Sequence, residues 1–265
     1  MKQQTKRHIR QWVLFVVVAL ASLNFGTNTE AQTLNYTYSF ILSEKTDNSA
    51  IANTSARELF RQVYENRYTW GSQFPGYTAA VELKQGKENY KGRVRVNSDM
   101  SVEVSGIDQE EARQAVENSL RMISVHRRQV PFNQVHQNST FRFGATDKAG
   151  SVEIFEQSDK TQAHYKVSQN QIIQVNRLLG NTAVTVDVLD SEKTPEGYLP
   201  TRYRSTFHQP QTKEVMGVEE SEDTYKKVGN YYLLTRQEIR DFEKGQLTDT
   251  AEFEYTDIQL LSGKP

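Results

Sequence analysis

The sequence predicts a mainly β fold of the α+β class: a strongly curved antiparallel sheet, or half-barrel, with two main amphipathic helices covering its concave face. Apolar and polar residues alternate over residues 77–105 and again over residues 140–261. Such alternation is typical of antiparallel strands with one buried face. Two stretches with helical periodicity, residues 55–68 and 108–127, interrupt the alternation. A large curved sheet needs cover for its apolar face, and two amphipathic helices can supply it.

The N-terminus predicts a secretory signal peptide over residues 1–31. Four basic residues precede an apolar run over residues 12–23, and Thr29 and Ala31 place small residues before a cleavage site at Gln32. The run is shorter than the roughly 20 residues that a transmembrane helix needs. We therefore expect export to the periplasm, or to the thylakoid lumen in a photosynthetic organism. Retention of the segment as a membrane anchor is the alternative.

The composition excludes several classes of protein. The chain has no cysteine, so disulfides and thiol chemistry are ruled out. After residues 1–31 are removed, 28 basic and 32 acidic residues remain, which does not favour binding to nucleic acid or to an anionic membrane. No later segment is long and apolar enough to be a transmembrane segment. We expect a soluble mature chain with a flexible lead over residues 32–53 and a single half-barrel domain over residues 54–261.

The first helix is expected over residues 55–68. Ser55 and Glu58 have the spacing of a capping box, and apolar side chains then recur on one helical face. The connection that follows, residues 64–77, carries five aromatic rings. Two interpretations stay open for these rings. They form a hydrophobic corner that anchors the helix, or they line the mouth of a ligand cavity.

A meander of three strands is expected over residues 77–105, and a longer run of hairpins follows the second helix. Turn residues separate several of these segments. The later strands are expected over residues 141–145, 152–156, 163–167, 172–178, 182–189, 201–207, 215–225, 231–242 and 248–260.

The second helix is expected over residues 108–127, with Asp108 as its N-cap. Its buried stripe consists of Ala112, Val116, Leu120 and Ile123. Positive charge near its end, at His126, Arg127 and Arg128, suits the helix dipole. The same three residues are candidates for contact with an anionic group.

No motif predicts catalysis or a bound metal. The chain lacks a His-Glu-x-x-His pair, a Gly-x-Ser-x-Gly elbow, a phosphate-binding loop and a dinucleotide fingerprint. Acidic residues cluster in a predicted strand at Glu219, Glu220, Glu222 and Asp223. A strand directs alternate side chains to opposite faces, so we interpret this cluster as a solvated edge. We predict no catalytic residue, no metal and no cofactor, and an enzyme is the least favoured class.

Three stretches resemble a family of uncharacterised, mainly cyanobacterial proteins, catalogued only as a domain of unknown function. They are SARELFRQVYENRYTWGSQFPGYTAAVELKQGKENYKGRVRVNSDMSVEVSGID, EGYLPTRYRSTFHQPQTKEV and YKKVGNYYLLTRQEIR. The resemblance covers residues 54–239 and implies no established activity. The order of elements is also similar to the LolA/LolB and LppX lipoprotein- and lipid-carrier fold, in which a half-barrel wraps helices around a hydrophobic cavity. No functional residue is carried over from that fold.

These observations predict an exported, non-catalytic carrier or binding protein for an apolar ligand such as a lipid, acyl chain or pigment. The expected ligand contacts are Trp70, Phe74, Tyr77, Val81, Leu83, Val94, Val102 and Val104. The alternative is an accessory or assembly protein that binds another protein through its sheet and has no ligand cavity.

The signal peptide is tested by sequencing the N-terminus of the exported protein. The expected first residue is Gln32, or one within a few positions of it. A mature chain that still carries residues 12–23 would instead indicate a membrane anchor.

Overall fold

The computed structural model describes residues 55–159 and 161–262, and these form one antiparallel sheet and three helices. The helices are α1 (Ala56–Glu65), α2 (Glu110–Arg127) and α3 (Phe132–His136). The strands are β1 (Gly76–Gln85), β2 (Glu88–Asn97), β3 (Val102–Ser105), β4 (Thr140–Thr146), β5 (Val152–Gln157), β6 (Gln162–Ser168), β7 (Gln171–Leu179), β8 (Thr182–Thr194), β9 (Gly197–His208), β10 (Val215–Val228), β11 (Tyr231–Glu243) and β12 (Gln246–Leu260). The predicted signal peptide and N-terminal lead lie outside the described residues.

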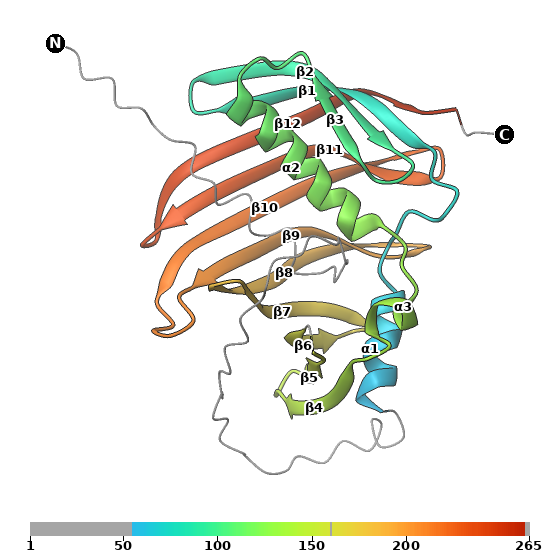
Figure 1. Cartoon of the computed structure of the whole chain (residues 1–265), viewed down its shortest axis with the longest axis vertical. Helices are drawn as coiled ribbons and strands as arrows, with labels where there is room; N and C mark the ends of the chain where they lie inside the picture. Colours follow the sequence, from blue (N-terminus) through green and yellow to red (C-terminus); the bar gives the residue numbers. More distant parts are fainter. Residues whose placement is uncertain (1–54, 160, 263–265) are drawn as a thin grey trace.

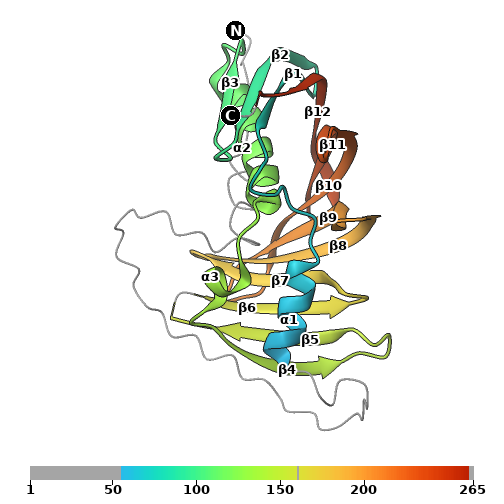
Figure 2. The ribbon, with the colours of Figure 1, turned by 90° about the vertical axis from the view of Figure 1, so that its right-hand side faces the viewer.

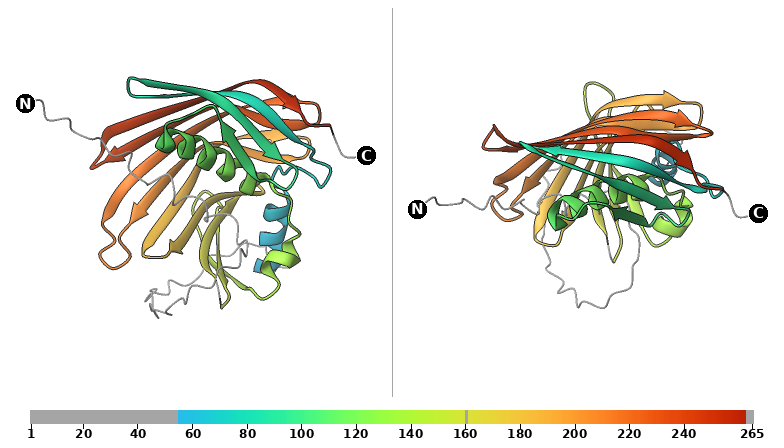
Figure 3. Two further views of the ribbon diagram at one scale, coloured as in Figure 1. Left: turned by 45° about the horizontal axis from the view of Figure 1, so that its top comes forward. Right: turned by 90° about the horizontal axis from the view of Figure 1, so that it is seen from above.

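The sheet is continuous but does not close into a barrel. Its strand order is β3-β2-β1-β12-β11-β10-β9-β8-β7-β6-β5-β4, so β3 and β4 are its two edges. The last strand returns to pair with the first, as in the register Val81↔Tyr255. The sheet curves around α2 (Figure 3). The predicted mainly β fold with a curved antiparallel sheet is confirmed.

Both main helices lie on the same face of the sheet. Helix α2 crosses the strands from β9 to β12 (Figure 1), and α1 lies against β4–β7 (Figure 2). The register places Tyr165, Val175 and Val186 in one row across β6, β7 and β8. Phe60 of α1 packs on Tyr165, with ring centroids 4.4 Å apart, while Met122 of α2 belongs to the buried cluster around Val186. This row of buried side chains therefore packs against both α1 and α2.

The opposite face of the sheet carries a ladder of ion pairs. Arg204 lies 2.6 Å from Glu220, which also lies 3.5 Å from Arg240. Arg236 lies 2.6 Å from Glu252 on the next strand. Each surface pair contributes at most about 1 kcal/mol, so the ladder chiefly keeps this face polar. The two faces together explain the alternation in the sequence.

Helix α1 ends at Glu65, three residues before the predicted end. The chain beyond it pairs with the start of β9: Tyr68 N–H donates to Tyr198 O at 2.8 Å, and Tyr198 N–H donates to Asn66 O at 2.9 Å. Gly197 permits this close approach, because its φ is +134° and an added Cβ would lie 2.3 Å from Asn66 O. Tertiary pairing here replaces the last helical turn.

Helix α2 begins with a different cap from the one predicted. Gln109, not Asp108, is the N-cap, and its Oε1 accepts from Ala112 N–H at 2.5 Å. The longer Gln side chain reaches the same N3 amide that a shorter cap would satisfy. All four residues of the predicted stripe, Ala112, Val116, Leu120 and Ile123, are buried.

Residues 64–77 form a packed corner between α2 and the β10–β11 hairpin. Trp70 is 1% exposed and stacks on Phe74 with ring centroids 4.3 Å apart. Its indole Nε1–H donates to Tyr232 O at 3.2 Å, and its backbone N–H donates to Arg127 O at 2.6 Å. The corner thus fixes the C-terminal end of α2 to the sheet.

Replacing Trp70 by Ala is expected to lower the free energy of unfolding by about 3–5 kcal/mol, because it deletes a buried large aromatic side chain. Chemical denaturation measures the loss. Leu189→Ala, at a side chain that is 39% exposed, is the control and should change stability by less than about 0.5 kcal/mol. Equal losses in the two variants would show that the corner does not stabilise the fold.

Candidate functional site

A cavity of about 60 Å³ lies between the C-terminal turn of α2 and the inner face of β7–β10. Most of its wall is apolar. The apolar lining residues are Ile123, Ile172, Val175, Val186, Val188 and Pro200. The lining residues with polar groups are Arg67, His126, Arg127, Tyr198, Tyr203, Asp223 and Tyr225.

Strand β10 brings acidic and aromatic side chains into the interior. Glu219, Ser221, Asp223 and Tyr225 alternate along the strand and are all buried. This finding corrects the solvated edge predicted for the acidic cluster. Strand β10 lies within the sheet, so one of its faces is covered by α2, and the period of two directs half of the cluster there.

Arg127 is the buried cation of the cavity. The residue is only 5% exposed, and its Nη2–H donates to Tyr225 Oη at 3.0 Å. Tyr225 in turn donates its hydroxyl proton to Asp223 Oδ2 at 2.9 Å. Within the described part of the chain, Arg127 Nε has no hydrogen-bond partner. The guanidinium therefore has donor capacity left inside the site.

A chain of hydrogen bonds continues from Asp223 to α2. Gln237 Nε2–H donates to Asp223 Oδ1 at 2.8 Å, and Ser119 Oγ–H donates to Gln237 Oε1 at 2.6 Å. Burial raises the pKa of Asp223 to about 6, although hydrogen bonds from Gln237 and Tyr225 and the charge of Arg127 oppose the rise. This carboxyl group is the single acidic side chain among the residues that line the cavity.

His126 is a neutral member of the cavity wall. Burial, followed by the charges of Arg127, Arg67 and Arg177, lowers the pKa of its imidazole to about 3. Its Nε2 has no hydrogen-bond partner among residues 55–159 and 161–262. Two of these arginines, Arg67 and Arg127, also line the cavity.

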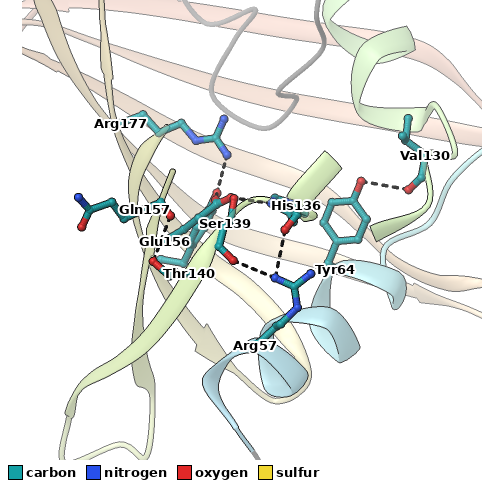
Figure 4. Close-up of polar contacts among 10 residues, drawn as sticks. Arg57, Tyr64, Val130, His136, Ser139, Thr140, Glu156, Gln157 and Arg177 are labelled. Carbon is teal, nitrogen blue, oxygen red and sulfur yellow. Dashed lines mark hydrogen bonds and ion pairs between the residues drawn. The ribbon is translucent and has the colours of Figure 1, made fainter. Parts of the chain in front are cut away.

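A second buried polar cluster surrounds Glu156 of β5 (Figure 4). His136 Nδ1 lies 2.6 Å from Glu156 Oε1, which also accepts from Ser139 Oγ–H at 2.7 Å. Tyr165 donates its hydroxyl proton to Glu156 Oε2 at 2.7 Å. Arg57 donates to the backbone carbonyls of His136 and Ser139 at 3.1 and 2.9 Å. These bonds attach α3 to β5 and α1, and we interpret the cluster as structural.

The sequence-predicted site residues fall into two groups. The eight predicted ligand contacts pack together within the largest buried cluster or against it: Trp70, Phe74, Tyr77, Val81, Leu83, Val94, Val102 and Val104. None of them lines the cavity. Of the three predicted anion contacts, His126 and Arg127 do line it, while Arg128 is exposed and does not.

Sequence reasoning missed Arg67, Asp223 and Tyr225. The alternation along β10 was a signal for the last two, because it places Asp223 and Tyr225 on one face. Arg67 carried no such signal, since its position depends on the pairing of residues 66–68 with β9.

Two further properties concern the described residues as a whole. Over residues 55–159 and 161–262, no helix combines the length and the apolar character that crossing a membrane requires. The same residues contain no group of three or more His, Asp or Glu side chains arranged to hold a metal ion.

The chain belongs to the family described as "Protein of unknown function (DUF3386)", whose profile matches residues 51–261. This match confirms the predicted resemblance to a family of unknown function. No curated protein matches the chain.

Solved structures with low similarity include a domain described as an outer membrane lipoprotein-sorting protein from Vibrio parahaemolyticus. It has 11% identity and a TM-score of 0.34, over 79% of this chain and 94% of that chain. MucB in complex with MucA(peri) has 9% identity and a TM-score of 0.20, over 78% of this chain and 99% of that chain. The Pseudomonas aeruginosa MucA/MucB complex has a TM-score of 0.19 at the same identity and coverage. These scores are too low to transfer a function.

Acidic pH is expected to destabilise the protein through Glu156. Burial alone would raise the pKa of this carboxyl, but the hydrogen bonds and charge of His136 and the hydrogen bonds of Ser139 and Tyr165 lower it from 4.5 to about 2. The carboxylate therefore contributes stability that is complete above its unfolded pKa and is lost as the pH falls through its folded pKa. Urea unfolding across that window measures the loss.

Glu156→Gln removes one partner of the buried pair and should cost about 3–5 kcal/mol at neutral pH. The free energy of unfolding of this variant should also fall less steeply with decreasing pH than that of the wild type. Glu88→Gln, at an exposed position of β2, is the control and should leave both quantities unchanged. An unaltered acid response in Glu156→Gln would contradict this assignment.

Proposed function

We propose that the protein is an exported, non-catalytic carrier or binding protein that holds a small apolar ligand, or the end of a longer one, beneath the C-terminal turn of α2. The observation that carries the proposal is the apolar wall of the cavity. Side chains from β7, β8 and α2, including Val175, Val186 and Ile123, face one another there without filling the space. Burial of each methylene in such a space is worth about 0.8 kcal/mol.

The volume limits what the cavity accepts in this conformation. About 60 Å³ corresponds to roughly two water molecules, each taking about 30 Å³ in the liquid. A lipid or acyl chain therefore enters by its end, and a deeper position requires α2 to move away from β8 and β9. The export of the carrier rests on the pattern of residues 1–31.

A protein partner is the second candidate, and the small volume favours it. Ligand pockets usually measure about 300–1,000 Å³, well above the cavity of about 60 Å³. An interaction protein needs no cavity, and β3 and β4, the edges of the sheet that the described residues form, offer backbone groups to a partner strand.

The test uses the exported protein, purified without detergent. On the carrier hypothesis, solvent extraction and native mass spectrometry detect a bound apolar molecule. Val188→Phe places a larger ring in the cavity wall and should abolish this binding, at a stability cost of about 1–3 kcal/mol. Leu189→Phe, at the next residue but on the exposed face, is the matched control and should retain the ligand.

The carrier hypothesis fails if the folded wild-type protein carries no apolar molecule and binds none when octanol is added. It also fails if Val188→Phe and Leu189→Phe bind equally well. Either result leaves the protein-partner hypothesis as the better account of the small cavity.

A further inference from the structure

We infer that the ligand of this cavity is an anionic amphiphile whose carboxylate is bound by Arg127 and Arg67. This inference rests on the proposed function and adds the chemical class of the ligand. It depends on three observations: the charge balance of the lining residues, the unused donors of Arg127, and the apolar lining residues that β7 and β8 supply.

The lining has an excess of positive charge. Two guanidinium groups, those of Arg67 and Arg127, face one carboxyl group, that of Asp223. Asp223 already accepts hydrogen bonds from Tyr225 and Gln237, so its oxygens are engaged within the protein. Within the described part of the chain, neither arginine forms an ion pair with a carboxylate. A net charge of about +1 thus remains in a largely apolar space even when Asp223 is ionised, which favours an anion.

Arg127 has donors that the protein itself does not use. A guanidinium offers five N–H donors, and the side chain of Arg127 makes one hydrogen bond to a described residue, from Nη2 to Tyr225. Its Nε lacks a partner in the described part of the chain, although the residue is only 5% exposed. A buried, unsatisfied charged donor is costly. A carboxylate with two oxygens in one plane matches the guanidinium fork and removes that cost.

Arg67 is held in place beside the same space. Its Nε–H donates to Tyr64 O at 2.8 Å, and its guanidinium lies 3.8 Å from the centre of the Tyr64 ring. The pairing of residues 66–68 with β9 fixes its backbone. Both arginines are therefore positioned before any ligand arrives, which reduces the ordering cost of binding.

The remaining lining sets the shape of the ligand. Ile172, Val175, Val186 and Val188 come from the two adjacent strands β7 and β8 and form an apolar wall. An ion with no apolar part leaves this wall unused, and an uncharged chain leaves the arginines unpaired. A carboxylate joined to an alkyl chain satisfies both. The carboxylate is compact enough for a cavity of about 60 Å³, and contact of the chain with the apolar wall requires α2 to move away from β8 and β9.

The experiment compares three probes with the same alkyl chain by isothermal titration calorimetry at neutral pH: octanoate, octanol and octyl phosphate. Octanoate is expected to bind at least about tenfold more tightly than octanol, a difference of about 1.4 kcal/mol. In Arg127→Met the affinity for octanoate should fall to the level of octanol, while octanol binding is retained. Arg128→Met, at the exposed neighbour outside the cavity, is the matched control and should bind octanoate like the wild type.

Arg67→Met is the second variant, and it decides the question if circular dichroism shows that Arg127→Met is unfolded. It leaves the hydrogen bond from Arg127 to Tyr225 intact. It should also lower octanoate affinity about tenfold and spare octanol. Equal binding of octanoate and octanol by the wild type overturns the head-group assignment but leaves the apolar-ligand function standing. Tighter binding of octyl phosphate than of octanoate overturns the choice of a carboxylate. Failure of all three probes to bind the folded wild type overturns the proposed function itself.

Discussion

The rest of the structure depends on the pairing of β1 with β12, because it joins the first strand of the sheet to the last. Without this pairing, β1–β3 would be a separate meander and α2, which follows β3, would have no fixed position over the later strands. The register from Tyr77↔Leu260 to Gln85↔Ala251 sets how far the meander extends along β12. It thereby sets where α2 crosses the inner face and where the C-terminal turn of α2 ends, above β8 and β9. The cavity is a consequence of that placement.

Local sequence patterns were sufficient for the two main helices and the strands. They did not predict α3, nor the contacts between elements. Periodicity predicted both main helices and the strands, since each needs only the side chains of its own segment. It failed at Tyr68, because the chain after Glu65 pairs with β9 and leaves the helix. It also failed at Asp108, because Gln109 is the N-cap of α2. The end of α1 depends on Tyr198, which is distant in sequence, whereas the cap is a local bond from Ala112 N–H to the Gln109 side chain. For the site, the pattern on β10 placed Asp223 and Tyr225 on one face, but only the strand order shows that this face is buried. Arg67 enters the site solely through tertiary pairing.

Polar groups under α2 carry a cost that an apolar core would avoid. Ser119, Gln237 and Asp223 are each at most 4% exposed, and burying such groups is tolerated only when their hydrogen bonds are complete. Their mutual bonds meet that condition and also fix α2 at one register over β10 and β11. The bonds of Glu156 to His136 and Ser139 likewise attach α3 and the chain after it to β5. Arg127 differs from Ser119, Gln237 and Asp223, since its Nε has no partner among the described residues.

The aromatic connection, residues 64–77, links these observations although its rings do not line the cavity. Arg67 lies within this segment, and Trp70 N–H donates to the backbone carbonyl of Arg127 at 2.6 Å. The indole of Trp70 is anchored in turn by Phe74 and by the carbonyl of Tyr232. One packed corner therefore positions both cationic side chains, one through its own backbone and the other through the end of α2. The rings act as a rigid support, which holds the two like charges beside the same cavity. The corner and the cavity therefore share Arg67 and the C-terminal end of α2.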